Sequence, residues 1–209
     1  MSLRLWDEHV VPRITDASLR GREIGELRER VCTGLSGRVV EIGFGSGLNV
    51  RWWPPTVTGV SAVEPSDVAW ALSERRRARS STAVERAGLD GQLLDLPDDS
   101  HDGALVTFSL CTIPDPARAL HEMGRVVRPG GRLHLLEHGL SPDEDVRRWQ
   151  RRLEPVQRAV AGGCHLTRDI SALVEASGWR IQDVESFALP GPTLSRPWTY
   201  LHLGTATND

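Results

Sequence analysis

The stretch of sequence that decides the fold is Val39-Val40-Glu41-Ile42-Gly43-Phe44-Gly45-Ser46-Gly47-Leu48-Asn49. An apolar run enters this stretch, and Glu41 closes the run. Glycines follow at alternate positions, Gly43, Gly45 and Gly47. Alternate glycines let the backbone turn sharply and leave no side chain between the backbone and a ligand. A loop of this kind, between a strand and a helix, receives the polar end of a nucleotide-like cofactor.

The spacing of the glycines argues against a dinucleotide, and so against an NAD-dependent oxidoreductase. A dinucleotide fingerprint reads G-x-G-x-x-G. Started at Gly43, that register needs a third glycine where Leu48 stands. Started at Gly45, it needs one where Val50 stands. Glu41 lies where an acceptor would hold a cation, and an acid followed by alternating glycines suits a ligand with an ammonium group. This pattern indicates S-adenosylmethionine.

Length and composition exclude several classes of protein. The 209 residues fit one domain, residues 1–209, with a full core, and 39% hydrophobic and 25% charged residues are ordinary for a globular protein. A net charge of -3 argues against a nucleic-acid binder that neutralises phosphates. The three cysteines form no regular framework, which favours a reducing cytoplasm. No apolar run approaches the roughly 20 residues of a membrane span, so we expect no membrane anchor and a monomer or homodimer.

Expected strands and helices alternate along most of the chain. Apolar runs predict strands at residues 37–43, 57–64, 83–87, 103–109 and 132–138, and two closing strands at 179–187 and 198–206. Helical spacing predicts helices at residues 16–35, 46–53, 66–80, 116–127, 141–161 and 167–177. The expected helix caps are Asp16 or Ser18 for the first helix, and then Ser66, Asp115 and Thr167. This alternation predicts an α/β fold with a doubly wound, mostly parallel, seven-stranded sheet.

Two segments stand outside this alternation. Residues 1–36 are expected to form an N-terminal helical segment. After Gly139 the alternation breaks, and residues 141–178 are expected to form a helical cap inserted before the closing strands. Pro155 lies inside the expected helix of that cap and predicts a kink or a break.

The carboxyl ends of the first four expected strands carry the residues that a nucleoside needs, because ligands of a parallel open sheet bind there. Glu64 lies about 20 residues beyond the glycine loop and can accept hydrogen bonds from a ribose diol. Asp90 suits the amino edge of an adenine, and Thr107 is expected beside the sulfonium. The candidate cofactor-binding residues are Glu41, Gly43, Gly45, Gly47, Glu64, Pro65, Asp90, Gly91, Thr107 and Phe108.

With these residues assembled, the chain resembles the class I S-adenosylmethionine-dependent methyltransferases. The resemblance is carried by the acid-glycine loop and by residues 97–102, 113–116 and 126–131. It implies a Rossmann-like methyltransferase fold. The chain is also similar to quinone-biosynthesis methyltransferases.

A narrower resemblance reaches nearly to the C-terminus and is to the methyltransferase-like thiol methyltransferases of vertebrates. It is carried by residues 107–111, Glu137-His138, Trp149-Gln150, Glu154-Pro155, Gly163-Cys164 and residues 166–168. It implies transfer of a methyl group to small alkyl thiols and hydrogen sulfide. That family begins with an apolar membrane anchor, and this sequence departs from it at the front.

The methyl acceptor, a small molecule, is expected above the ends of the fourth and fifth strands, because an in-line displacement needs the nucleophile opposite the leaving sulfur. His138 is the candidate catalytic residue. It could accept the proton of a thiol, whose ordinary pKa is about 8.5, or it could be a histidine hydrogen-bonded at a strand end. The expected lining of the acceptor pocket is Cys111, Trp149, Cys164, His165 and Arg168.

Two other functions stay open. The acceptor could be an O, N or C atom of a quinone-like or other metabolite, or the chain could bind S-adenosylmethionine without catalysis. No metal site is expected, because His134 and His138 lie four residues apart in one strand and no carboxylate spacing near them resembles a ligand set.

Overall fold

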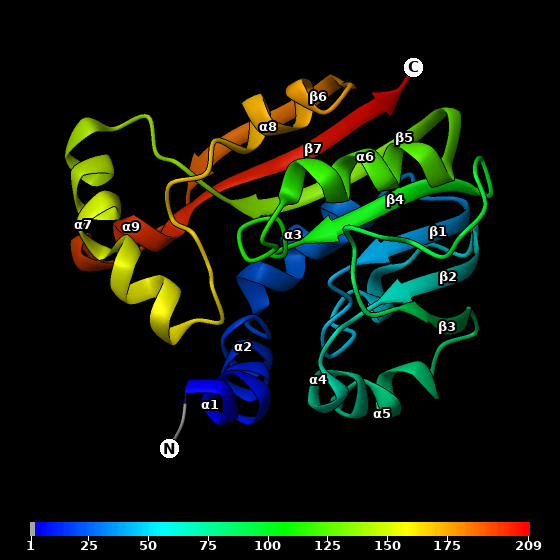
Figure 1. Cartoon of the computed structure of the whole chain (residues 1–209), viewed down its shortest axis with the longest axis horizontal. Coiled ribbons are helices and arrows are strands. Elements are labelled where there is room, and N and C mark those ends of the chain that lie inside the picture. The colour runs from blue at the N-terminus through cyan, green and yellow to red at the C-terminus, as the bar shows by residue number, and fades with distance from the viewer. Residues whose placement is uncertain (1–2) are drawn as a thin grey trace.

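A seven-stranded sheet organises the molecule (Figure 1), and the computed structural model describes residues 3–209. The strands are β1 Gly37–Ile42, β2 Val57–Val63, β3 Ala83–Gly88, β4 His101–Thr107, β5 Val127–His138, β6 Trp179–Ala188 and β7 Tyr200–Asn208. Their order is β3-β2-β1-β4-β5-β7-β6. The first five strands are parallel, and β7 runs antiparallel to both of its neighbours. The predicted doubly wound, mostly parallel sheet is confirmed.

Helices cover both faces of the sheet. They are α1 Leu3–His9, α2 Val11–Ser18, α3 Arg22–Cys32, α4 Asp67–Leu72, α5 Glu74–Arg77, α6 Pro116–Val126, α7 Glu144–Val160, α8 Ile170–Ala176 and α9 Arg196–Thr199, with 3-10 turns η1 Val50–Trp52 and η2 Thr193–Ser195. Val106 of β4 packs in one core with α6 and α8, and the adjacent Leu105 packs in a second core with α3. Successive side chains of a strand point to opposite faces, so central strands that are buried on both faces read as unbroken apolar runs.

Two of the four expected helix caps are confirmed. Ser66 Oγ accepts from the Ala69 N–H at 3.1 Å, and Asp115 Oδ1 accepts from the Arg118 N–H at 3.0 Å. Thr167 is wrong, because α8 begins later and Asp169 caps it. Asp16 or Ser18 is wrong too, because both lie in the last turn of α2 and no side chain caps α3. A carboxylate accepts the free amides of a first helical turn as readily as a hydroxyl does, so either residue type satisfied the sequence pattern.

Three expected helices differ from the observed ones. The helix expected at residues 16–35 is divided, since α2 ends at Ser18 and α3 begins at Arg22 after an extended Gly21. The one expected at 46–53 is only η1, because Gly47 has a left-handed φ of 75° and delays helical geometry until Val50. The one expected at 66–80 is divided into α4 and α5. The first two residues of the expected segment 1–36 lie outside the described residues.

The helix α7 runs without interruption through Pro155, so of the expected kink or break the break is wrong, and the kink stays a prediction. Pro155 and Arg151 are both exposed. Water can therefore satisfy the Arg151 carbonyl that a proline leaves without its helical donor.

Residues 141–168, here called the excursion, leave the sheet after β5 and return before α8. The ends of the excursion meet, because the Leu140 N–H donates to the Arg168 carbonyl at 2.9 Å. In Figure 1 α7 and α9 lie beyond the ends toward which the arrows of β1, β2 and β4 point. Ile170 and Val174 of α8 are in the core with α6, so within 141–178 only the excursion stands clear of the sheet. Among residues 3–209, no helix has the length and apolar content needed to cross a membrane.

Candidate functional site

The glycine loop after β1 leaves open space beside its backbone. Gly43, Gly45 and Gly47 have left-handed φ values of 70°, 58° and 75°. A Cβ added at Gly45 would meet only the Gly43 carbonyl, at 3.8 Å, whereas a Cβ at Gly43 would lie 1.9 Å from Ser109 Oγ. The loop therefore needs glycine at position 43 for packing, and at position 45 it offers a bare backbone to a ligand.

Glu41 lies under this loop and is 1% exposed. Its Oε1 accepts from Asn49 Nδ2 at 2.9 Å. Its Oε2 is buried and has no hydrogen-bond partner within the part of the chain that the structure describes. Burial raises the pKa of Glu41 to about 7. The buried indole N–H of Trp53 lies near this carboxyl but makes no hydrogen bond to it, so Oε2 can still accept from a ligand that brings an ammonium group.

Arg28 of α3 joins the same site and was not predicted. It is 4% exposed, and its Nη1 donates to Asn49 Oδ1 at 2.6 Å and to Thr107 Oγ1 at 3.0 Å. Burial lowers the pKa of Arg28 to about 10, so the guanidinium stays charged at neutral pH. A signal was present in the sequence, because Arg28 lies four residues after Ile24 and three before Val31, within the apolar stripe of α3.

Glu64 links the ends of β1 and β2. Its Oε2 accepts from the Gly45 N–H at 2.6 Å and its Oε1 from the Ser66 N–H at 2.7 Å. Each carboxylate oxygen has a further lone pair, so both can still accept from a ligand hydroxyl. Glu64 is buried, and the adjacent Pro65 is exposed.

The loop after β3 brings Asp90 and Gly91 to the same edge of the sheet. Asp90 is exposed, and its Oδ1 accepts from the Gln92 N–H at 2.9 Å. Gly91 is buried, and a Cβ there would lie 2.7 Å from Ile42 Cγ2 at the end of β1. At the end of β4, Thr107 is buried, and Phe108 has a left-handed φ of 54° with the Arg28 guanidinium 5.4 Å from its ring centre.

Asp16 of α2 ties the N-terminal helices to the glycine loop, a role the sequence did not indicate. Its Oδ1 accepts from Ser46 Oγ at 2.6 Å and from Arg76 Nη2 at 2.9 Å. Arg76 also donates to the Ser46 carbonyl at 2.7 Å. The α2 helix is therefore held against the loop by charged hydrogen bonds, which are stronger than neutral ones.

Three soft donor atoms meet at the next strand ends. Cys111 follows β4, His138 ends β5, and Cys164 lies near the end of the excursion. His138 Nε2 is 3.3 Å from Cys164 Sγ, and the three donor atoms lie within 4.8 Å of one another. Burial lowers the pKa of His138, but the hydrogen bond to Cys164 and the nearby Glu137 carboxylate outweigh it, so the net shift is upward. The sequence spacing gave no sign of this cluster.

Glu137 holds the segment that carries Cys111. It is fully buried, and its Oε1 accepts from the Ser109 N–H at 2.7 Å and the Leu110 N–H at 3.0 Å. Burial raises the pKa of Glu137 to about 7. Because these bonds fix the chain after β4, Glu137 is a positioning residue for Cys111.

Of the expected acceptor-pocket residues, the structure brings four together and leaves one apart. The His165 N–H donates to the Cys111 carbonyl at 2.8 Å, and Arg168 Nη1 donates to the Ile113 carbonyl at 2.7 Å. Both contacts hold the end of the excursion on the loop after β4. Trp149 is 55% exposed and stacks with Arg152 of its own helix.

The residue of α7 that faces inward is Gln150, next to Trp149. Gln150 is fully buried. Its amide donates to the carbonyls of Gly139, at 3.0 Å, and Pro197, at 3.1 Å. It also accepts from the Ser141 N–H at 3.0 Å. Gln150 therefore anchors α7 to both β5 and α9.

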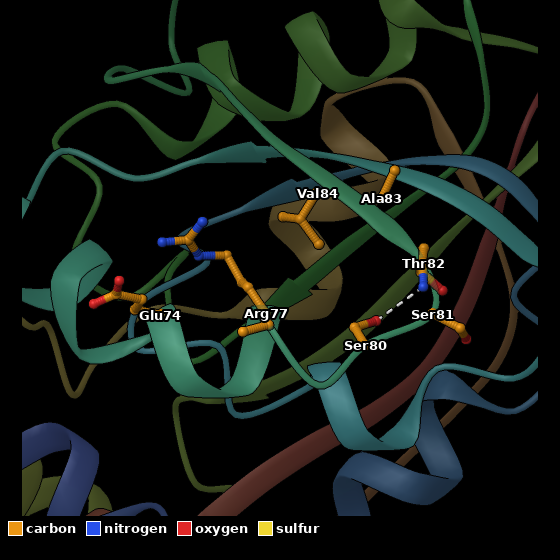
Figure 2. A pocket seen from close by; sticks show the side chains of 8 residues that line it. Glu74, Arg77, Ser80, Ser81, Thr82, Ala83 and Val84 are labelled. Carbon is orange, nitrogen blue, oxygen red and sulfur yellow. Dashed lines mark hydrogen bonds between the residues drawn. The ribbon is translucent and has the colours of Figure 1, made fainter.

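A separate hollow lies away from this site. Figure 2 shows a depression of about 430 Å³ between α5 and the start of β3, bordered by Glu74, Arg77 and Val84. Ser80 Oγ accepts from the Thr82 N–H there at 3.0 Å. The depression lies at the amino end of β3, whereas ligands of parallel sheets bind at the carboxyl ends.

Several known proteins are similar to this chain in sequence or in fold. Residues 40–135 match a family model described as a methyltransferase domain. Rat thiol S-methyltransferase TMT1B is 32% identical over 137 residues, which are 63% of this chain and 55% of the relative. The demethylmenaquinone methyltransferase of Clavibacter sepedonicus is 30% identical over 111 residues, 53% of this chain and 45% of the relative. The chain thus spans about half the length of these relatives.

A solved structure from Thermotoga maritima has the same fold. It is described as an S-adenosylmethionine-dependent methyltransferase and possible histamine N-methyltransferase. It superposes with a TM-score of 0.68, covers 100% of both chains and is 20% identical in sequence.

Proposed function

Because residues 40–135 match a family model described as a methyltransferase domain, we propose that the chain transfers a methyl group to a small thiol. Family and fold imply S-adenosylmethionine as the cofactor. The observation that carries the proposal is the pairing of two neighbouring sites at one edge of the sheet. The open glycine backbone and the unpartnered Glu41 Oε2 lie at the end of β1, and a sulfur- and imidazole-lined site follows at the ends of β4 and β5.

The cofactor's methionine end carries an ammonium and a carboxylate, and the first strand end offers a partner for each. Glu41 Oε2 suits the ammonium. Arg28 suits the carboxylate, because its Nε is a buried donor with no partner among residues 3–209. Glu64 is proposed for the ribose diol, and Asp90 with Gly91 for the adenine edge. The cofactor supplies an electrophilic methyl group on a sulfonium, and these contacts orient it.

The acceptor site is proposed to lie among Cys111, His138, Cys164, His165 and Arg168. His138 is the residue proposed to make the acceptor available as a thiolate, since the thiolate and not the thiol is the nucleophile. The excursion closes this side and excludes water, which strengthens electrostatic interactions inside. A reducing compartment would keep Cys111 and Cys164 as thiols, which supports a cytoplasmic location.

A thiol acceptor is favoured because the rat relative is a thiol S-methyltransferase and matches more of this chain than the quinone-pathway relative does. The second candidate is methylation of a quinone-like metabolite, which the similarity to demethylmenaquinone methyltransferase supports. Binding without catalysis is the third, and the closed acceptor side counts against it.

The test is incubation of the purified chain with methyl-labelled S-adenosylmethionine and separate panels of thiols, phenols, amines and quinols. We expect label in the thiol panel. Label only in the quinol panel would establish the second candidate. Tight binding of S-adenosylmethionine with no transfer to any panel would leave a binding protein.

A further inference from the structure

We propose that Cys111, His138 and Cys164 bind one Zn²⁺ ion, and that the fourth position on the ion takes the sulfur of the acceptor. The metal site stands on geometry alone. Its part in the reaction rests on the proposed thiol methylation and explains how His138 contributes to it.

The distances fit a tetrahedral site. Zinc binds sulfur at about 2.3 Å and imidazole nitrogen at about 2.0 Å, which separates two such ligands by about 3.5 Å. His138 Nε2 and Cys164 Sγ are already 3.3 Å apart. Cys111 Sγ lies within 4.8 Å of both, so a small rotation of its side chain completes three corners.

The donor set selects a soft ion. Two thiolates and an imidazole are the ligands that zinc prefers, and magnesium or calcium would need oxygens. Two thiolate charges cancel the charge of Zn²⁺, so the occupied site is neutral and suits its burial. The end of the excursion that carries Cys164 is itself held in place, because the His165 N–H donates to the Cys111 carbonyl at 2.8 Å.

Three protein ligands with one open corner are typical of catalytic zinc, whereas structural zinc has four protein ligands. All three ligand residues are buried, Cys111 at 2%, Cys164 at 8% and His138 at 9% exposed, so the fourth position is shielded from bulk water. A thiol that binds there loses its proton to solvent, because a coordinated thiol is deprotonated outright. Its sulfur keeps the electron pair that forms the new bond to the methyl carbon, as the bond from that carbon to the sulfonium breaks.

The first experiment titrates the metal-free chain with Co²⁺ and follows the thiolate-to-cobalt charge-transfer absorption. We expect saturation at one ion per chain. Cys111→Ser and Cys164→Ser should each weaken binding by more than the roughly 10–100-fold that loss of an orienting partner costs. Cys32→Ser is the matched control, because Cys32 is also a buried free thiol but lies in α3.

Binding of S-adenosylhomocysteine by each variant reports that the fold is intact. Unchanged cobalt absorption in both Cys111→Ser and Cys164→Ser, with that binding preserved, would overturn the proposal. So would an equal loss in Cys32→Ser, or a Cys111–Cys164 disulfide in place of the metal in protein purified under reducing conditions.

The second experiment separates this proposal from the proposed function. Protein from which a chelator has removed the metal should bind S-adenosylmethionine normally but should not methylate thiols. Added Zn²⁺ should restore thiol methylation. Metal-free protein that methylates thiols at the full rate would overturn the role of zinc and leave the thiol methyltransferase standing. If the protein binds zinc through the cluster but methylates no thiol, the metal site is supported and the proposed thiol methylation is contradicted.

Discussion

The two sides of the site are built from different materials and held in different ways. The cofactor side, made of Arg28, Glu41, Gly45, Asn49, Glu64 and Thr107, uses oxygen and nitrogen groups hydrogen-bonded across three strand ends and α3. The acceptor side, made of Cys111, His138, Cys164 and the excursion, uses two sulfurs and an imidazole from three distant parts of the chain. The sheet itself prepares the first side, whereas a segment outside the sheet completes the second. A substitution on one side should therefore impair the function of that side and leave the other side intact.

The sharpest way to break the cofactor side alone is Gly45→Leu. The new side chain would fill the open space beside the loop, so cofactor binding should be abolished, as measured by titration calorimetry. Gly130→Leu is the matched control, because Gly130 also has a left-handed φ, 77°, and a Cβ there meets nothing within 4 Å. Equal loss of binding in both variants would point to backbone strain instead of an occupied site.

The acceptor side should break alone in His138→Ala. We expect the methylation rate to fall by about 10²–10⁴-fold, the range for loss of a group on which formation of the thiolate depends, whether His138 acts directly or as a ligand of the proposed ion. Cofactor affinity should stay near that of the wild type, because the residues of the cofactor side lie on other strand ends. A methylation rate near that of the wild type would show that His138 only lines the pocket and has no part in the reaction.

Glu64→Gln tests whether the links between strand ends hold the cofactor side together. Each oxygen of Glu64 accepts a backbone N–H, and an amide NH₂ cannot accept. Cofactor binding should weaken by about 1–3 kcal/mol. Asp90→Ala should lose less in the same titration, because Asp90 is exposed. If Glu64→Gln binds the cofactor as tightly as the wild type does, Glu64 is not part of the cofactor site.

The pH dependence of cofactor binding should depend on Glu41. Its pKa of about 7 in the free protein means that the carboxyl is protonated below that pH. An ammonium binds the carboxylate form, so affinity is full above pH 7 and falls by up to about tenfold per unit between pH 7 and 5. Calorimetry across this range should show the slope in the wild type and a flat profile in Glu41→Gln. A flat wild-type profile would contradict the assignment.

Trp149→Ala is expected to have the smallest effect. The ring is 55% exposed, so both the melting temperature and kcat/KM for a thiol should change by the equivalent of about 0.5 kcal/mol or less. A large rise in KM would show instead that α7 folds its exposed face over the acceptor during turnover.

Much of the fold and of the cofactor side could be predicted because their signals are local. The glycine loop, the apolar runs of the central strands, and the caps Ser66 and Asp115 each act within a few residues of the chain. Arg28 and Asp16 were missed because their partners, Thr107 and Ser46, become neighbours only after the sheet forms.

The residues of the acceptor side were predicted one at a time. The sequence did not predict that the donor atoms of three of them lie close together. Nothing in the spacing of Cys111, His138 and Cys164 says that three atoms meet within 4.8 Å. Hydrophobic pattern also misreads α7, where the polar Gln150 is buried and Trp149 is exposed. Gln150 is buried because it satisfies two backbone carbonyls outside its own helix, and an apolar side chain could not do so.

The hydrogen bond between the Leu140 N–H and the Arg168 carbonyl makes the excursion an interchangeable cassette. Its two ends are hydrogen-bonded to each other, so the length and sequence of the segment between them can change without moving β5 or α8. Grafting a foreign segment that keeps Cys164 should then change what is methylated while leaving the methyl donor the same.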